Sequence, residues 1–455
     1  MNSRRTLLLA FALVALTTPW AQAQTAEYPA ITHAPPDARI RAMVDAVSAD
    51  DLRAIDTRLV GFGTRNDFSE QLNSPTRGVF AARDWLRAQF EAIAQGTDGR
   101  MTVALDDYVQ PKTSRTPRAV AESSVIATLK GDDPTAATYV ISGHYDDCHG
   151  DCTRGDGDAP GADDNGSGSA AVLEAAKVMA TSHFRGTIIF AIFDGEELGL
   201  WGSEHFAAAL QTQGVRVAAN LNNDIIGASV DDRGRPDPYE VRLFSQSLPE
   251  TAKVAAVNAL GSENDSPSRE LARFVAEASE PYTAPMKVEQ IFRADRFLRG
   301  GDQESFQAHG FPAVRFVEAH ETFIHQHHDV RVVNGVQQGD LLQYLDFDYL
   351  ARVTRMNVAA LAALALGPEA PSQPQMLTRA LGNTTTLRWQ PATAAASYEI
   401  VWRATDAPNW QYAKDVGNVT QATIDASKDD YIFGVRTVDT QGHRSPAAYP
   451  LPVRQ

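Results

Sequence analysis

Cysteine is nearly absent from this chain. Only two of its 455 residues are cysteines, Cys148 and Cys152, so a disulfide framework cannot hold the fold together. The two lie close together in the sequence, and in an oxidising compartment we expect them to form one local disulfide. Zinc ligation, with His149 between them, is the alternative, although two cysteines alone make a poor structural zinc site.

Long apolar runs are also missing, apart from one near the N-terminus. This run, Leu7 to Leu16, is too short to span a bilayer as a stable helix. It follows Arg4-Arg5 and precedes the small-residue stretch Ala21-Gln22-Ala23, which is typical of a signal peptide and its cleavage site. We therefore expect residues 1–23 to be a signal peptide. The rest of the protein should be exported, periplasmic or extracellular, with no membrane span.

Basic residues are outnumbered. There are 41 Lys and Arg against 57 Asp and Glu, which gives a net charge of −16. Such a balance disfavours nucleic acid or an anionic membrane surface as a partner. Carboxylates gathered around cations would account for a small part of the excess.

Helical and strand patterns alternate over most of the chain. A chain of 455 residues with 43% apolar residues can bury the cores of two or three domains. The alternation predicts an α/β fold with a largely parallel, mixed sheet flanked by helices. Strands are predicted at 101–109, 124–129, 138–142, 187–193, 217–224, 241–244 and 313–317, and helices at 38–55, 78–93, 167–180, 203–212, 268–278, 303–309 and 341–366.

The composition changes after residue 366. Residues 367–374 contain three prolines and are predicted to be a linker. Short strands of alternating polarity follow, which predicts a small β-sandwich over 375–455. Its motifs Leu387-Arg388-Trp389, Tyr398-Glu399-Ile400 and Tyr431 to Arg436 resemble a fibronectin type III domain. No cluster of His and carboxylate residues suggests chemistry in this segment.

The first candidate site motif is Gly143-His144-Tyr145-Asp146, at the end of a predicted buried strand. Residues two apart on a strand share a face. Asp146 can therefore bond the second ring nitrogen of His144, which fixes the tautomer of a metal ligand, or stand beside it at the metal. A polar surface turn is the alternative interpretation.

The second motif, Gly161 to Gly168, opens a predicted helix and contains Asp163-Asp164-Asn165. Asp, Asn and Ser are common helix caps, so capping is the alternative here. Three consecutive carboxylate or amide residues exceed what a cap requires, however. A carboxylate held between glycines in this way is a candidate bridge between two cations.

Acidic residues also end the next two predicted strands. Glu196 and Glu197 follow strand 187–193, at the end where α/β sheets place their active sites. One glutamate can ligate a metal while the other acts as a base, and a solvated acidic turn is the alternative. Asp224 ends strand 217–224, where an unpaired charge would be costly. Three successive strands thus end in candidate metal-site residues.

A second histidine is expected to complete the site. The candidates lie in the stretch 320–329, which contains His320, His325, His327 and His328. His320 and His325 are five positions apart, so they do not match the zinc-binding helix in which two histidines are four apart. Some of these histidines are expected to be solvated loop residues.

Taken together, the motifs resemble the M28 family of zinc aminopeptidases. Gly-His-x-Asp, Gly-Ala-Asp-Asp-Asn-Gly-Ser-Gly, Asp-Gly-Glu-Glu-x-Gly and Asn-x-Asp-x-Ile-Gly occur in family order between Ser124 and Leu366. The resemblance implies a phosphorylase/hydrolase-like α/β domain over 24–366 that holds two zinc ions. It implies that Asp164 bridges the ions, that Asp146 orients His144 and that Glu196 is the general base. The implied zinc ligands are His144, Asp164, Glu197, Asp224 and His325.

The choice of the last ligand follows the family pattern Tyr-His-x-x-x-Asp. His325 stands four residues before Asp329 but lacks the preceding tyrosine, and His327 is the alternative. Two zinc ions can polarise a scissile carbonyl and supply hydroxide near neutral pH, while Glu196 moves the proton.

The resemblance therefore implies an exported aminopeptidase that acts on peptides with a free N-terminus. A metallo-carboxypeptidase or aminoacylase, and a zinc enzyme similar to glutaminyl cyclase, are the alternatives among enzymes. A secreted binding protein with an inactive catalytic domain is the alternative of another class.

Overall fold

An eight-stranded sheet forms the centre of the larger part of the molecule. The computed structural model describes residues 28–247 and 265–454, so the predicted signal peptide lies outside the described residues. The strand order is β1-β2-β4-β3-β5-β8-β6-β7. The strands are β1 (Met101–Gln110), β2 (Val120–Leu129), β3 (Thr138–His144), β4 (Thr187–Phe193), β5 (Val217–Asn223), β6 (Glu240–Ser245), β7 (Lys287–Ile291) and β8 (Ala313–Glu318).

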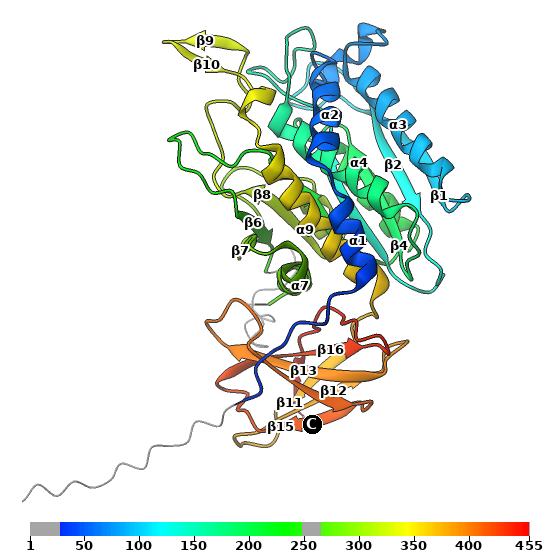
Figure 1. Cartoon of the computed structure of the whole chain (residues 1–455), viewed down its shortest axis with the longest axis vertical. Coiled ribbons are helices and arrows are strands. Elements are labelled where there is room, and N and C mark those ends of the chain that lie inside the picture. Colours follow the sequence, from blue (N-terminus) through cyan, green and yellow to red (C-terminus); the bar gives the residue numbers. More distant parts are fainter. Residues whose placement is uncertain (1–27, 248–264, 455) are drawn as a thin grey trace, which may run out of the picture.

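Figure 1 shows α2, α4 and α9 over one face of this sheet, and α8 packs against the other face through Phe306. Strand β4 is buried on both sides, which explains its nearly continuous apolar run. Phe190 packs into the large core beneath α4 and α9, and Phe193 packs with Phe306 of α8 on the other side. The helices are α1 (Ala38–Ala46), α2 (Ala49–Val60), α3 (Val79–Gln95), α4 (Gly168–Met179), α5 (Trp201–Thr212), α7 (Pro267–Thr283), α8 (Gln303–Ala308) and α9 (Phe347–Leu366).

The sheet is mixed, and its parallel part lies at the centre. Strand β3 pairs in parallel with β4 and β5, and β5 pairs in parallel with β8. Strands β1 and β2 are added antiparallel at one side, and β6 pairs antiparallel with β8 at the other. The predicted α/β fold with a mixed sheet flanked by helices is confirmed. Because β3, β4 and β5 run the same way, the residues that follow them meet at one edge.

Some element boundaries differ from the sequence-based prediction. The helix predicted over 38–55 is two helices, because Val47 is extended and the Ser48 side chain caps α2 by accepting from Asp51 N. The helix predicted from residue 341 begins at Phe347, where Asp346 caps it. Strand β7 and the hairpin of β9 (Arg331–Val333) and β10 (Val336–Gln338) were not predicted, since they are short, and none of their residues is buried.

Helix α9 is the most apolar long helix among the described residues. By length and composition it could cross a membrane, but 83% of its most apolar window is buried inside the protein. It packs against α1, α2, α4 and α7. One polar side chain in this helix, Asn357, exchanges hydrogen bonds with Asn223 at the end of β5, at 2.7 and 3.1 Å. The core helix therefore fixes the strand end that precedes Asp224.

Two small sheets form the C-terminal part of the molecule (Figure 1). One has the order β15-β12-β11-β17 and the other β14-β13-β16, and a shared core that includes Trp389 and Trp402 joins them. Strand β11 begins at Ser372, inside the predicted linker, because that segment pairs with β12 and β17. The strands are β11 (Ser372–Leu377), β12 (Thr385–Gln390), β13 (Ser397–Ala404), β14 (Tyr412–Gly417), β15 (Gln421–Ile424), β16 (Tyr431–Val438) and β17 (Leu451–Val453).

Buried ion pairs connect the C-terminal sheets to α7. Asp265, just before α7, accepts from Arg403 of β13 at 3.0 and 3.1 Å. Arg436 of β16 donates to Glu277 of α7 at 2.7 Å. Breaking a buried pair by removing one partner is strongly destabilising. These pairs therefore hold the small sheets against the larger part.

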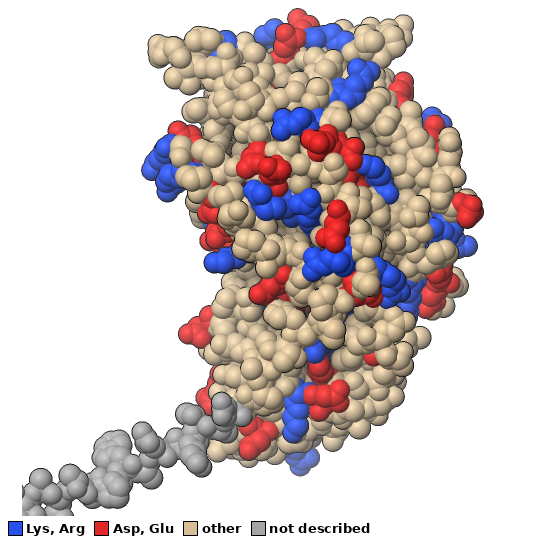
Figure 2. Space-filling view, in the orientation of Figure 1, with Lys and Arg blue, Asp and Glu red and all other residues tan. Residues whose placement is uncertain are grey.

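Charges of both signs are intermixed on the face drawn in Figure 2. No broad basic area covers that face, in keeping with the net charge of −16. Many of the carboxylates lie inside the protein instead, as the metal centre shows below. Exposed pairs such as Lys177 with Asp51 contribute about 0–1 kcal/mol each.

The amide pair between α9 and β5 gives a stability prediction. Asn357→Leu keeps a similar side-chain volume but leaves the buried amide of Asn223 without its partner. We expect the free energy of unfolding to fall by about 1–3 kcal/mol, with a lower melting temperature in calorimetry. The control, Asn418→Leu, replaces an exposed asparagine and should change stability by less than about 0.5 kcal/mol. Equal melting temperatures for the two variants would contradict this account.

Candidate metal centre

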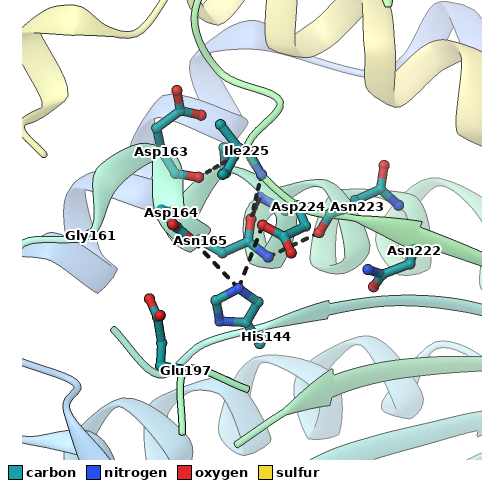
Figure 3. A network of polar contacts seen from close by, with 12 residues as sticks. His144, Gly161, Asp163, Asp164, Asn165, Glu197, Asn222, Asn223, Asp224 and Ile225 are labelled. Carbon is teal, nitrogen blue, oxygen red and sulfur yellow. Dashed lines mark hydrogen bonds and ion pairs between the residues drawn. The ribbon is translucent and has the colours of Figure 1, made fainter. Parts of the chain in front are cut away.

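The ends of three adjacent parallel strands supply the polar side chains of the candidate site. His144 ends β3, Glu196 and Glu197 follow β4, and Asp224 follows β5. Asp164 comes from η2 (Ala162–Ser167), the turn before α4. In Figure 3, Asp164 and Asp224 turn toward the ring of His144, and Glu197 reaches the same space from below. The predicted convergence of these residues is present.

The carboxylate of Asp164 lies between two imidazoles. Its Oδ1 is 3.4 Å from Nε2 of His144, and its Oδ2 is 3.0 Å from Nε2 of His327. Asp224 Oδ1 lies 3.7 Å from Nε2 of His144, and Glu197 Oε2 lies 3.0 Å from Nε2 of His327. Asp164 thus belongs to two groups of three side chains, one around each histidine.

The backbone around Asp164 is held by long-range hydrogen bonds. The N–H groups of Asp163 and Asp164 donate to the carboxylate of Asp340 at 2.7–2.9 Å. The Asn165 side chain donates to the carbonyl of Asn223 at 2.9 Å. A Cβ on Gly168 would lie 2.2 Å from that same carbonyl oxygen, so this position requires glycine. These contacts fix η2 against the end of β5.

Asp146 connects His144 to Glu197. One of its oxygens lies 3.3 Å from Nδ1 of His144, and the other accepts from the backbone N–H of Glu197 at 3.0 Å. Burial opposes a charge on His144, but Glu196 and the neighbouring carboxylates outweigh it and raise the pKa of the imidazole. Nδ1 of His144 also lies 3.2 Å from the backbone carbonyl oxygen of Asp146, so Asp146 contacts a residue in each of the two groups.

Arg315 of β8 pairs with Asp224. Its Nη2 lies 2.9 Å from Asp224 Oδ2, and its Nη1 donates to Asp295 at 2.9 Å. Burial alone would raise the pKa of Asp224, but Arg315 and His144 outweigh it and lower that pKa. Arg315 lies outside the motifs predicted to form the site, and its signal in the sequence is a basic residue within the otherwise apolar stretch 313–317.

The choice between His325 and His327 is corrected by the structure. His327 faces Asp164 and Glu197, whereas the ring of His325 stacks on Tyr344 at 3.6 Å between centroids. The backbone of His327 is left-handed, with φ +53°. The spacing to Asp329 favours His325, whereas this turn directs the side chain of His327 toward the other candidate ligands.

Glu196 lies close to the His144 side of the site. Ligand atoms of His144, Glu196 and Asp224 all lie within 4.8 Å of one another. The Glu196 side chain is half-buried, and burial raises its pKa well above the ordinary value for glutamate. Its carboxyl group lies close enough to the candidate ligands to act as a proton acceptor at the site.

The side chains present fit zinc. Nε2 of His144, Nε2 of His327 and Oε1 of Glu197 are buried atoms with no hydrogen-bond partner. The two Nε2 atoms lie 3.0–3.7 Å from carboxylate oxygens, which leaves these donors arranged as ligands around a cation. Imidazole and carboxylate donors in this combination suit zinc.

The expected local disulfide is present between Cys148 and Cys152. The disulfide excludes zinc ligation by their thiolates. Sγ of Cys148 lies within 4.8 Å of ligand atoms of Glu197 and His327, so the disulfide borders the candidate centre. It limits the freedom of the loop that follows His144.

Arg65 holds the two ends of that loop together and belongs to none of the predicted motifs. Its fully buried guanidinium donates to the carbonyls of Tyr145, Pro160 and Gly161 at 2.6–2.9 Å. Its backbone N–H donates to Asp147 at 2.9–3.0 Å. One side chain thus joins the end of the His144 motif to the start of the Asp164 motif.

A group of buried carboxylates beside the site was also missed. Oxygens of Asp67, Glu122 and Asp194 lie within 4.8 Å of one another. Burial raises the pKa of Glu122 to about 11 and that of Asp194 to about 7. Asp67 and Glu122 come from separate parts of the chain, and neither follows a recognisable motif.

A cavity of about 500 Å³ opens over the candidate ligands. Asp164, Glu196, Glu197, Asp224 and His327 line its floor. The walls come from the segments before β2 and before α8. A ligand can therefore reach these carboxylates and His327 from solvent.

Comparisons with known proteins match this arrangement to one family. The model of peptidase family M28 matches residues 124–334. A probable zinc metalloprotease of Leptosphaeria maculans is 46% identical over 422 residues, which cover 92% of this chain and 98% of that relative. A probable zinc metalloprotease of Pyrenophora tritici-repentis is 44% identical over 425 residues and covers 92% and 88%.

Solved structures share the fold at lower identity. The LapA aminopeptidase of Legionella pneumophila is 21% identical with a TM-score of 0.51, over 74% of this chain and 77% of that chain. Glutaminyl cyclase of Macrostomum lignano is 15% identical with a TM-score of 0.51, over 73% and 94%. At these identities the likeness concerns the fold alone.

The hydrogen bonds around Asp340 give a testable prediction. Asp340→Asn replaces one acceptor oxygen by an NH₂ group that faces the N–H groups of Asp163 and Asp164. We expect zinc affinity, measured by competition with a chelator, to fall about 10- to 100-fold. Asp329→Asn is the control, since Asp329 pairs with His149 and Arg331 and not with the candidate ligands. An unchanged zinc affinity in Asp340→Asn would contradict a role of Asp340 in positioning Asp164.

Proposed function

Because this chain belongs to peptidase family M28, whose relatives are named zinc metalloproteases, we propose that it is an exported dizinc aminopeptidase. It would remove the N-terminal residue of peptides. The observation that carries the proposal is the place of Asp164, whose two oxygens face His144 on one side and His327 on the other. A carboxylate so placed can bridge two cations.

The proposed ligands divide into two sets that share Asp164. One ion would be held by His144, Asp164 and Asp224, and the other by His327, Asp164 and Glu197. Two zinc ions held there would act as Lewis acids on the scissile carbonyl and lower the pKa of water. Asp146 holds His144 and the backbone of Glu197 in place.

Glu196 is the proposed general base. It lines the cavity and its carboxyl lies near His144 and Asp224. Its carboxylate would take a proton from water and return it to the nitrogen of the residue after the scissile bond as the C–N bond breaks.

One comparison supports action at the N-terminal end of peptides. LapA, which shares the fold, is named an aminopeptidase.

We also propose roles for the remaining segments. Residues 1–23 would be a signal peptide and 24–366 the catalytic domain. Residues 375–455 would form a fibronectin type III-like domain, supported by the two facing sheets with Trp389 and Trp402 in their core. The Cys148–Cys152 disulfide is consistent with export to an oxidising compartment.

Glu196→Gln tests the mechanism. We expect two zinc ions per chain in both the variant and the wild type by elemental analysis, because this substitution leaves the proposed ligands intact. The kcat on a panel of aminoacyl nitroanilides should fall by about 10²-fold or more. Glu204→Gln, in α5 on the protein surface, is the control. Full activity in Glu196→Gln, or in a sample stripped by a chelator, would rule out the proposed mechanism.

A pair of histidine variants tests the ligand assignment. His327→Ala should lower the zinc content to about one ion per chain and reduce activity strongly. His325→Ala should keep two ions, because His325 stacks on Tyr344 and does not face the carboxylates. The opposite pattern would restore His325 as the ligand.

A further inference from the structure

The walls of the cavity over the metal centre are unusually basic. Fourteen residues line it, and four of them are arginines: Arg115, Arg296, Arg299 and Arg315. The acidic lining residues, apart from Glu304, belong to the candidate metal centre itself. Zinc would neutralise part of that floor, whereas the arginines on the walls keep their charge at any physiological pH.

Two of the four arginines are neutralised within the protein. Arg315 is paired with Asp224 and Asp295, and its side chain is only 1% exposed. Arg296 pairs with Glu321 at 2.5 Å and with Asp295 at 3.0 Å. These two arginines hold the wall in place and are not available to a ligand.

Among the described residues, no ion pair involves Arg115, and the ion pair of Arg299 uses a carboxylate that it shares with other arginines. The Arg115 guanidinium contacts the carbonyl oxygen of Glu197 at a long distance, 3.5 Å. Arg299 lies 3.7 Å from Glu321, a carboxylate already shared by Arg242 and Arg296. Its other contact is 3.4 Å to Gln326 Oε1.

Both of these arginines lie close to the candidate ligands. Arg115 contacts the backbone of Glu197, and Arg299 contacts Gln326, the residue before His327. An extended peptide advances about 3.3–3.6 Å per residue. When the scissile carbonyl is at the metal centre, the next residue of the peptide therefore lies within reach of the cavity walls that carry Arg115 and Arg299.

We propose that Arg115 and Arg299 form an anion-binding subsite for a carboxylate carried by the residue after the scissile bond. The planar guanidinium fork matches a carboxylate in geometry and charge. The carboxylate has two possible sources, the C-terminus of a dipeptide or an acidic side chain. The inference rests on the proposed function, since it names the substrates that the same site prefers.

Four peptides with the same preferred N-terminal residue, Xaa, test the subsite on the zinc-loaded full-length enzyme. Xaa-Ala is compared with Xaa-Ala amide, and Xaa-Glu amide with Xaa-Gln amide. We expect at least one of the two ratios of kcat/KM to reach about tenfold in favour of the carboxylate, mainly through KM. The first ratio reports a C-terminal carboxylate and the second an acidic side chain. The preference should weaken at high salt, because charge attraction at an open cavity is screened.

Variants assign the preference to the two arginines. In the double variant Arg115→Gln/Arg299→Gln the preferred ratio should fall to about one, and Arg→Lys at both positions should restore part of it. Arg293→Gln is the matched control, because Arg293 stacks on exposed Phe297 and does not line the cavity. It should keep the wild-type ratio.

The outcomes separate this inference from the proposed function. Both ratios below about twofold in the wild type, or a preference that survives in the double variant, would overturn the subsite. Failure to cleave any of the four peptides would contradict the proposed function instead. In that case, calorimetry would give the dissociation constants of the same four peptides for the wild type and the double variant. The ratios of these constants, compared in the same pairs, would test the subsite.

Discussion

A single carboxylate, that of Asp164, faces both halves of the metal centre, and much of the surrounding structure keeps it there. Burial alone would raise its pKa, but His144 and His327 outweigh this effect and lower the pKa. Its backbone is bound by Asp340, and the turn that carries it packs directly on the end of β5. A shift of this one residue would change the surroundings of both histidines at once.

The site concentrates negative charge in the interior, and buried arginines neutralise only part of it. Arg315 neutralises part of the charge around Asp224, while Asp67, Glu122 and Asp194 form a second buried acidic group close by. Zinc ions, which the family implies, would offset the charge of the carboxylates at the candidate metal centre. The net charge of −16 is therefore partly a property of the interior, and the surface drawn in Figure 2 carries both signs.

The sequence predicted the fold class and most of the residues that meet at the site. The reason is geometric: His144, Glu197 and Asp224 follow three parallel strands, and parallel strands bring their carboxyl ends to one edge. Short motifs and apolar runs are visible in a sequence, so this convergence could be predicted. Their roles as ligands remain proposals that the zinc measurements above would test.

The residues that could not be predicted reach the site through long-range contacts. His327 was only the alternative ligand in the sequence, because its left-handed turn is not visible in the spacing of the residues. Arg115, Arg299 and Asp340 lie in loops, and only the folded chain places them beside the centre. Helix boundaries were also less predictable, because a cap such as that of Ser48 interrupts an otherwise continuous helical pattern.

The contacts of Arg65 have a consequence for the smallest active fragment. The segment that matches the family, residues 124–334, contains every proposed zinc ligand. It lacks Arg65, which joins the carbonyls of Tyr145 and Gly161, and Asp340, which binds the backbone of Asp164. Truncation to the family segment would keep the ligands and lose their alignment. The functional unit is therefore longer than the recognisable motif region, and it extends in both directions along the chain.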